Sequence, residues 1–171
     1  IHDNIKHIDQ WVKPKITNSN WKFYPSKCSV SPQPLGVVGI MAPWNYPFNL
    51  VMAPLAAAIS AGNRVMIKPS EITPKTSLLI NEIITSVFKN DEVHTVLGDV
   101  TVASTFSQLP LDHILFTGST QVGKIIMRNA AEHLTPVTLE LGGKSPVIID
   151  EKYNLKTAAK SIVGGKWFNA G

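Results

Sequence analysis

The chain has 171 residues and a formal net charge of +4, with 44% hydrophobic and 16% charged residues. This composition is typical of a globular domain with a buried core, and it excludes a disordered or low-complexity chain. The lysines are spread along the chain rather than gathered in a run, so the basic balance gives little support to a nucleic-acid partner.

Cys28 is the single cysteine, so no disulfide can form within the chain. A single cysteine is consistent with a reducing compartment, and we expect a cytoplasmic protein. The longest apolar stretch, residues 50–61, contains Pro54 and falls short of the roughly 20 residues that cross a bilayer. The histidines share no metal-ligand spacing, so no metal site is expected. The chain begins with Ile1 rather than Met, which suggests a piece of a longer protein.

The first 34 residues differ in pattern from the rest of the chain. Residues 1–14 place apolar side chains at helical spacing, and Pro14 ends the pattern. Residues 15–34 are rich in Ser, Asn and Pro, which predicts an extended connector. We therefore expect residues 1–34 to form an N-terminal helix and a connector.

Short apolar segments alternate with helical patterns over the rest of the chain. Strands that are separated by helices favour an α/β fold, with a parallel sheet, right-handed crossovers and helices on both faces. The predicted strands are residues 36–41, 63–67, 93–97, 113–117, 137–141 and 146–149. The predicted helices are residues 48–61, 74–88, 100–108, a helix from the 118–123 turn to about 133, and 155–168.

The stretch from residue 111 to residue 128 is the strongest candidate for a binding site. Its first part is typical of a buried strand, residues 118–123 form a turn of small residues, and apolar positions at helical spacing follow. This arrangement brings backbone N–H groups and the positive end of a helix dipole to one point, which favours phosphate binding. Glycines in the turn allow the anion to approach the backbone closely.

Three interpretations of this turn remain open. Thr120 stands where GxGxxG has its second glycine, but a nicotinamide dinucleotide site is still compatible with the pattern. Residues 118–124 match most of the P-loop pattern GxxxxGK and predict an NTP site, although Ile125 replaces the Ser or Thr that holds magnesium. The third interpretation is a strand-to-helix turn without a ligand.

Polar side chains also follow the strand at 36–41. Pro43 and Pro47 fix the backbone around Trp44 and Asn45, at an edge of the sheet where ligands bind in α/β folds. The Asn45 amide can donate a hydrogen bond to an oxyanion, and its alternative role is that of a turn or cap residue. The alternative role for Trp44 is packing in the core.

The strand at 63–67 ends in a second polar group. Lys68 and Glu71 would both lie past its carboxyl end, where they could hydrogen-bond the hydroxyl groups of a ribose. In the alternative, Ser70 or Thr73 caps the helix that follows, and Glu71 interacts with its dipole.

Glu140 stands in the otherwise apolar strand at 137–141. A carboxylate in such a setting is costly unless it is paired, and desolvation there would tune it as a general base. The alternative is a glutamate on an exposed face of the strand.

Four strand ends, in this order and at these intervals, resemble the NAD(P)-dependent aldehyde dehydrogenase superfamily. They are PWN at 43–45, KPSE at 68–71, FTGSTQVG at 116–123 and LELGGKSP at 139–146. The runs IKHIDQWVKP, PLGVVGI, LDHILFTGS and RNAAEHLTPVTLELGGKSP look most like the class 3 and coniferyl aldehyde dehydrogenase branch. The resemblance spans the chain. It implies a Rossmann-like cofactor domain at 35–141, followed by the start of a catalytic domain at 142–171.

The resemblance implies a role for each matching residue. Asn45 would stabilise the oxyanion of a thiohemiacetal, and Glu140 would activate water as the general base. Lys68 and Glu71 would bind the adenosine ribose, and Ser119 would hold the pyrophosphate. The further implied cofactor contacts are Pro43, Trp44, Ser70, Gly118, Thr120, Gln121, Val122, Gly123, Leu141 and Gly142.

The resemblance also implies a cofactor and a substrate. The cofactor would be NAD, with NADP as the alternative, because a carboxylate on the ribose hydroxyls disfavours a 2′-phosphate. The substrate would be an aldehyde, aromatic by the branch resemblance, and the full-length protein would be a homodimer. In this family Lys124 would be an ordinary helix lysine rather than part of a P-loop.

The chain departs from the family pattern at its end. The family's nucleophilic cysteine follows a GQxC-type segment shortly after the FNAG that stands here at 168–171, and this chain has no cysteine in that region. It would therefore hold the base and the oxyanion donor without the nucleophile. We expect the chain by itself to be an inactive fragment of a dehydrogenase.

Overall fold

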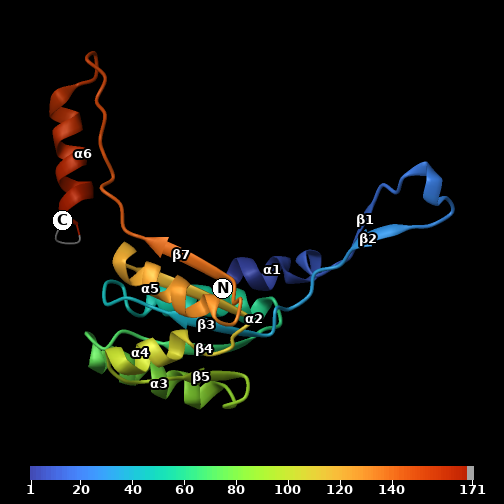
Figure 1. The fold of residues 1–171 in the computed structure, drawn as a ribbon. Helices are drawn as coiled ribbons and strands as arrows, with labels where there is room; N and C mark the ends of the chain where they lie inside the picture. Colours follow the sequence, from blue (N-terminus) through green and yellow to red (C-terminus); the bar gives the residue numbers. More distant parts are fainter. Residues whose placement is uncertain (169–171) are drawn as a thin grey trace.

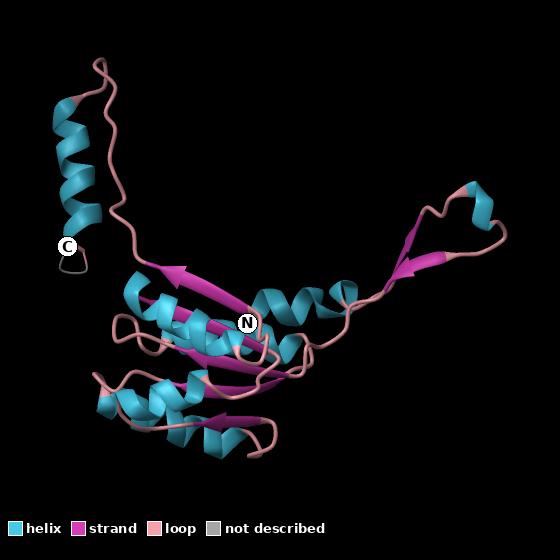
Figure 2. Ribbon diagram, viewed as in Figure 1, coloured by secondary structure: helices cyan, strands magenta, loops and turns pink. Residues whose placement is uncertain are grey.

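The computed structural model describes residues 1–168, so the last three residues of the FNAG segment lie outside the described part (Figures 1 and 2). The helices are α1 (His2–Trp11), α2 (Asn49–Ser60), α3 (Pro74–Val87), α4 (Val100–Ser107), α5 (Thr120–Ala131) and α6 (Leu155–Trp167), with a short 3-10 helix η1 (Trp21–Phe23). The strands are β1 (Lys15–Thr17), β2 (Cys28–Val30), β3 (Val37–Met41), β4 (Arg64–Lys68), β5 (Val93–Thr95), β6 (His113–Gly118) and β7 (Val137–Leu141).

Five of these strands form one sheet in the order β5-β4-β3-β6-β7, and their pairings are all parallel. The chain builds one half of the sheet outward from β3 to β5, then crosses back to place β6 and β7 on the other side of β3. The predicted α/β fold is confirmed. The order also creates a switch point between β3 and β6, where the connections leave in opposite directions.

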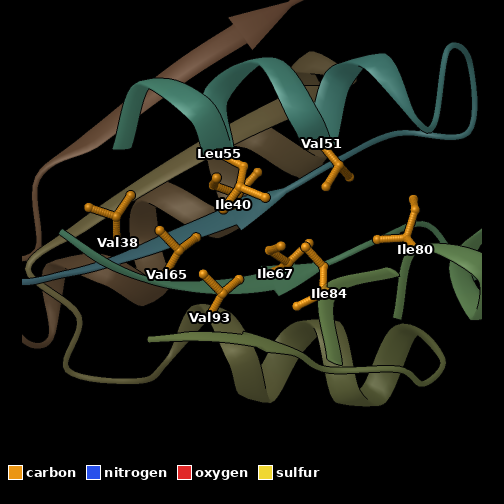
Figure 3. Close-up of a cluster of buried hydrophobic side chains, with 9 residues drawn as sticks. All are labelled: Val38, Ile40, Val51, Leu55, Val65, Ile67, Ile80, Ile84 and Val93. Atoms are coloured by element: carbon orange, nitrogen blue, oxygen red, sulfur yellow. The ribbon is translucent and has the colours of Figure 1, made fainter. Parts of the chain in front are cut away.

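Helices cover both faces of this sheet because side chains alternate along each strand. On one face, α2 and α3 pack on β3, β4 and β5 in a cluster that includes Ile40, Ile67 and Ile84 (Figure 3). On the other face, Phe106 of α4 and Ile126 of α5 pack on β3 and β6. Both apolar clusters hold the strands rigid, so the polar residues at the strand ends have fixed positions.

The segment at 15–34 is not the plain connector that the sequence predicts. It contains an antiparallel pair, β1 with β2, in which Lys15 is opposite Val30 and Thr17 is opposite Cys28. Figure 1 shows this hairpin projecting from the body of the molecule. The predicted N-terminal helix is present as α1, which packs on α2 through hydrogen bonds from the Asn4 side chain to the Ala56 carbonyl oxygen and the Ser60 hydroxyl.

The predicted strand at 146–149 is absent, since these residues form an extended segment without a strand partner in residues 1–168. Ile148, at 94% exposure, shows that the apolar side chains alone do not make a strand. A strand requires a neighbour for its backbone hydrogen bonds. The segment leads away from β7, and α6 runs back beside it (Figure 1).

None of the helices in residues 1–168 combines the length and hydropathy that a membrane span requires. The same residues contain no group of three or more His, Cys, Asp or Glu side chains that could hold a metal ion.

Candidate functional site

The pairing register brings the carboxyl ends of four strands to one edge of the sheet. Met41 on β3 is level with Lys68 on β4 and with Phe116 on β6, and Thr117 is level with Glu140 on β7. A cavity of about 610 Å³ opens at this edge. It is lined by residues 41–45, 68–72, 116–119 and 140–142, together with Val100, Ala103 and Val122. Its size is that of a typical small-molecule site, and its position at the switch point is where α/β sheets bind ligands.

Asn45 lies in a short, constrained segment between β3 and α2. The segment is bounded by Pro43 and Pro47, and Tyr46 has a φ of 52°, a left-handed conformation that costs a non-glycine residue about 1–3 kcal/mol. Strain of this kind persists where the surrounding structure holds a side chain in a required position. Trp44 is 58% exposed, so its alternative role in core packing is wrong in the described structure.

Lys68 and Glu71 form an ion pair at the rim of the cavity. The Lys68 ammonium lies 3.6 Å from a Glu71 carboxylate oxygen and donates a 2.8 Å hydrogen bond to the Pro69 carbonyl oxygen. Together the two side chains offer a donor and an acceptor side by side, which suits a vicinal diol. The alternative role of Ser70 or Thr73 as a side-chain cap is not observed, since α3 begins after Thr73 without a side-chain capping bond. Ser70 instead accepts a bond from the Ile72 N–H.

The connection between β6 and α5 consists of a single residue. Ser119 is the N-cap of α5, and its hydroxyl accepts a 3.3 Å hydrogen bond from the Val122 N–H. The first N–H groups of a helix have no partner within the helix, so this end of α5 presents a positive dipole to the cavity. The predicted turn over 118–123 is wrong in extent, because the helix already begins at Thr120. The P-loop alternative does not fit, since Lys124 lies within α5 and no loop remains to surround a phosphate.

Gly118 and Gly123 are required by packing inside the protein. A Cβ at Gly118 would lie 2.5 Å from Cζ of the Phe116 ring, and a Cβ at Gly123 would lie 2.8 Å from Cδ2 of Leu141. The sequence-based reason for these glycines was the approach of an anion. In the structure, Gly118 leaves room for the Phe116 ring of its own strand, and Gly123 allows α5 to approach Leu141 of β7 closely.

Glu140 lies at the cavity and is exposed, so the alternative position on an exposed face of the strand is the one observed and the buried setting is wrong. The reason is its strand: β7 forms the edge of the sheet and pairs only with β6 among the described residues. Apolar neighbours in the sequence therefore do not enclose this carboxylate.

The predicted site residues all line this cavity except Thr120, Gln121 and Gly123. Those three belong to α5, where Thr120 and Gln121 are exposed and Gly123 is buried. Sequence reasoning missed Val100 and Ala103 of α4, which form an apolar part of the wall. Their place in the chain could have predicted them, because α4 follows β5 and the carboxyl end of β5 lies at the same edge of the sheet.

A parallel sheet with a cavity at its switch point defines an α/β domain of the Rossmann-like class. The chain belongs to the aldehyde dehydrogenase family, whose model matches residues 3–171. The family predicted from the four strand ends is thereby confirmed.

Relatives and solved structures agree with this assignment. The chain is 52% identical over 171 residues to a "Probable coniferyl aldehyde dehydrogenase" of Pseudomonas aeruginosa, covering all of this chain and 36% of that protein. Staphylococcus aureus AldH in its substrate-bound state superposes with a TM-score of 0.95 at 44% identity, over 98% of this chain and 37% of that chain. Mycobacterium tuberculosis aldehyde dehydrogenase complexed with NAD+ superposes with a TM-score of 0.88 at 32% identity, over 99% and 35%. The chain thus spans about a third of the length of these relatives.

Proposed function

We propose that this chain forms the cofactor-binding part of an NAD(P)-dependent aldehyde dehydrogenase, which oxidises an aldehyde to a carboxylate. One observation carries the proposal: the Asn45 amide, the Glu140 carboxylate and the N-cap residue Ser119 line a single cavity. These groups can respectively stabilise an oxyanion, accept a proton from water and stand beside a pyrophosphate.

The donor set of the cavity fits a dinucleotide. Lys68 and Glu71 match the two hydroxyls of a ribose, and Ser119 with the N-terminus of α5 matches the pyrophosphate. Val100 and Val122 supply an apolar surface for a flat base. When bound, NAD(P)+ would supply the acceptor for the hydride of the aldehyde.

The chain's own residues would then serve the two halves of the reaction. Asn45 would donate a hydrogen bond to the oxyanion that forms when a cysteine thiolate attacks the aldehyde carbon. After this carbon has lost its hydride and become a thioester carbon, Glu140 would take a proton from water as the water oxygen attacks it, and the thiolate would leave as the carboxylate forms. Cys28 lies on the projecting hairpin, remote from the cavity, and is not assigned as the nucleophile (Figure 1).

The finer assignments extend the same proposal. We assign NAD as the preferred cofactor, because a Glu71 carboxylate on the ribose hydroxyls repels a 2′-phosphate. An aromatic, coniferyl-like aldehyde is supported by the similarity to the Pseudomonas aeruginosa protein. We further propose a cofactor domain at 35–141 preceded by the segment 1–34, a catalytic domain beginning at 142, a cytoplasmic location and a homodimer for the complete protein.

Calorimetry on the chain tests the cofactor assignment. We expect NAD+ to bind without magnesium, and Lys68→Met to weaken binding about tenfold, because the lost hydrogen bond involves a charged group. Lys124→Met is the matched control, since Lys124 is exposed on α5 and does not line the cavity. Magnesium-dependent binding of ATP, with none of NAD+, would overturn the proposal.

A second test concerns the nucleophile. We expect the reading frame of the complete protein to place a cysteine within a few codons after Gly171. The corresponding Cys→Ala variant of that protein should bind NAD+ but produce no NADH from an aldehyde.

A further inference from the structure

The segment that follows the proposed base is loosely packed. β7 ends at Leu141 and continues into Gly142 and Gly143, where an added Cβ would meet no atom within 4 Å. Two adjacent glycines without packing leave the backbone few constraints of its own. Another contact must therefore fix the path of the chain away from Glu140.

Lys166, near the end of α6, supplies such a contact. Its ammonium donates a 3.3 Å hydrogen bond to the Lys144 carbonyl oxygen and a second hydrogen bond to the Ser145 carbonyl oxygen. The contact joins residues that are 22 and 21 positions apart in the sequence. A lysine ammonium has three donors and no acceptor, so it can serve two carbonyl groups at once.

The backbone at the contact is also constrained. Ser145 has a φ of 44°, in the left-handed region that a serine rarely adopts. Figure 1 shows α6 running back beside the extended segment, so that its last turn returns toward the start of that segment. Of the described residues of α6, Ala158 alone is buried. The hydrogen bonds of the Lys166 ammonium are therefore a principal contact between α6 and the extended segment.

We infer that Lys166 is a positioning residue, which fixes the Gly142–Ser145 segment, and with it the end of β7 that carries Glu140, against the last turn of α6. This inference rests on the proposed function, in which the nucleophile follows α6. The hydrogen bonds of Lys166 would then set the distance between Glu140, the general base, and the thioester that is hydrolysed. Geometry of this kind strongly affects rate, since small displacements of reacting groups are costly.

The test uses the complete enzyme and the variants Lys166→Met, Lys166→Gln and Lys166→Arg. Met keeps the length of the side chain and removes the charge, whereas Arg keeps both the charge and the donors. The matched control is Lys160→Met, at an exposed position on the same helix. Rapid-mixing measurement of NADH separates the first turnover from the slower hydrolysis of the thioester.

We expect Lys166→Met to keep the NADH burst and to lower the steady-state kcat about tenfold or more, because only hydrolysis depends on the placement of Glu140. The KM for NAD+ should stay within about twofold, and Lys166→Arg should restore most of the rate. Lys160→Met should behave as wild type. If Lys166→Met does not fold, the same measurements on folded Lys166→Gln and Lys166→Arg replace it. Lys166→Gln should then show the lowered kcat and Lys166→Arg most of the wild-type rate.

Two results would overturn the inference: a kcat of Lys166→Met within about twofold of wild type, or a loss of burst and steady-state rate in equal proportion. The second result would show a general structural role. A wild-type enzyme that neither binds NAD+ nor forms NADH would instead refute the proposed function, so the two failures are distinguishable.

Discussion

The Lys68 ammonium and the Glu71 carboxylate form a pair of very unequal exposure: the lysine side chain is 2% exposed and the glutamate side chain 36%. A buried ammonium is costly unless it is paired and hydrogen-bonded, and ion pairs of this kind add little net stability. We propose that a bound ligand, rather than the stability of the fold, accounts for this pair. In the proposed function, the buried cation holds the carboxylate at the rim of the cavity, where it would accept hydrogen bonds from hydroxyl groups.

Glu71→Gln tests the role of this carboxylate. We expect NAD+ to bind about fivefold to a hundredfold more weakly, since a hydrogen bond to a charged group is lost, and the preference for NAD+ over NADP+ to shrink. Calorimetric titration with both cofactors measures the two effects. Glu82→Gln, at an exposed position of α3, is the control. An unchanged ratio of the two affinities in Glu71→Gln would contradict the role.

Gly118→Ala tests the close contact between Gly118 and the Phe116 ring at the end of β6. The new Cβ would lie 2.5 Å from Cζ of Phe116, a residue that is only 7% exposed and packs in an apolar cluster, so the ring would have to shift. We expect the free energy of unfolding to fall by about 1–3 kcal/mol, as in other overpacked cores. Denaturant unfolding followed by circular dichroism gives the value. Gly142→Ala, where nothing lies within 4 Å of the new Cβ, should change it by no more than about 0.5 kcal/mol.

Leu134→Gly should stabilise the chain. Leu134 follows α5 with a φ of 55° and is 88% exposed, so the backbone is strained and little packing would be lost. Glycine adopts this conformation without a steric penalty, and we expect a gain of about 1 kcal/mol in the free energy of unfolding. Leu134→Ala removes the same side chain but keeps the strain. A gain in Leu134→Ala equal to that of the glycine variant would argue against relief of strain as the cause.

The stability of the chain should depend on pH through His113. Desolvation by burial lowers the pKa of His113 below its ordinary value of 6.5, and Nε2 lies 3.0 Å from the Thr138 hydroxyl. The unfolded state therefore binds more protons than the folded state between the two pKa values, so folding loses stability as the pH falls below 6.5. Above that pH the histidine is neutral in both states, and its contribution is constant.

Urea unfolding at a series of pH values measures this effect. We expect the free energy of unfolding of wild type to decline on acidification more steeply than that of His113→Gln, with a constant difference between the two proteins at pH well above 6.5. Parallel curves over the whole range would show that His113 is not the group responsible.

Much of the fold followed from local patterns. The apolar runs of β3, β4 and β6 and the helical spacing of α3 and α5 lie close to the predicted ranges, because hydrophobic periodicity reports which face of an element is buried. The polar residues at the strand ends could also be found in advance. Parallel strands must present their carboxyl ends at the same edge, so Asn45, Lys68 and Glu140 were expected near one another.

The predictions that the structure overturned have a common cause. The hairpin of β1 and β2 has little periodicity, and the segment at 146–149 has strand-like composition but no neighbour to pair with among the described residues. Thr120 begins α5 earlier than the glycine pattern suggests, since Gly123 serves the packing of the helix on β7. Each of these outcomes depends on a partner that is distant in the sequence.

The amino-acid sequence alone thus determined the family, the alternation of strands and helices, and the identity of the polar groups at the strand ends, because each is encoded within a few neighbouring residues. Only the tertiary structure decided that Glu140 is exposed on an edge strand, that Lys68 is buried beside Glu71, and that Lys166 reaches the carbonyl groups after β7. Burial and long-range hydrogen bonds arise when separate elements pack together, and the spacing of residues along one element does not contain them.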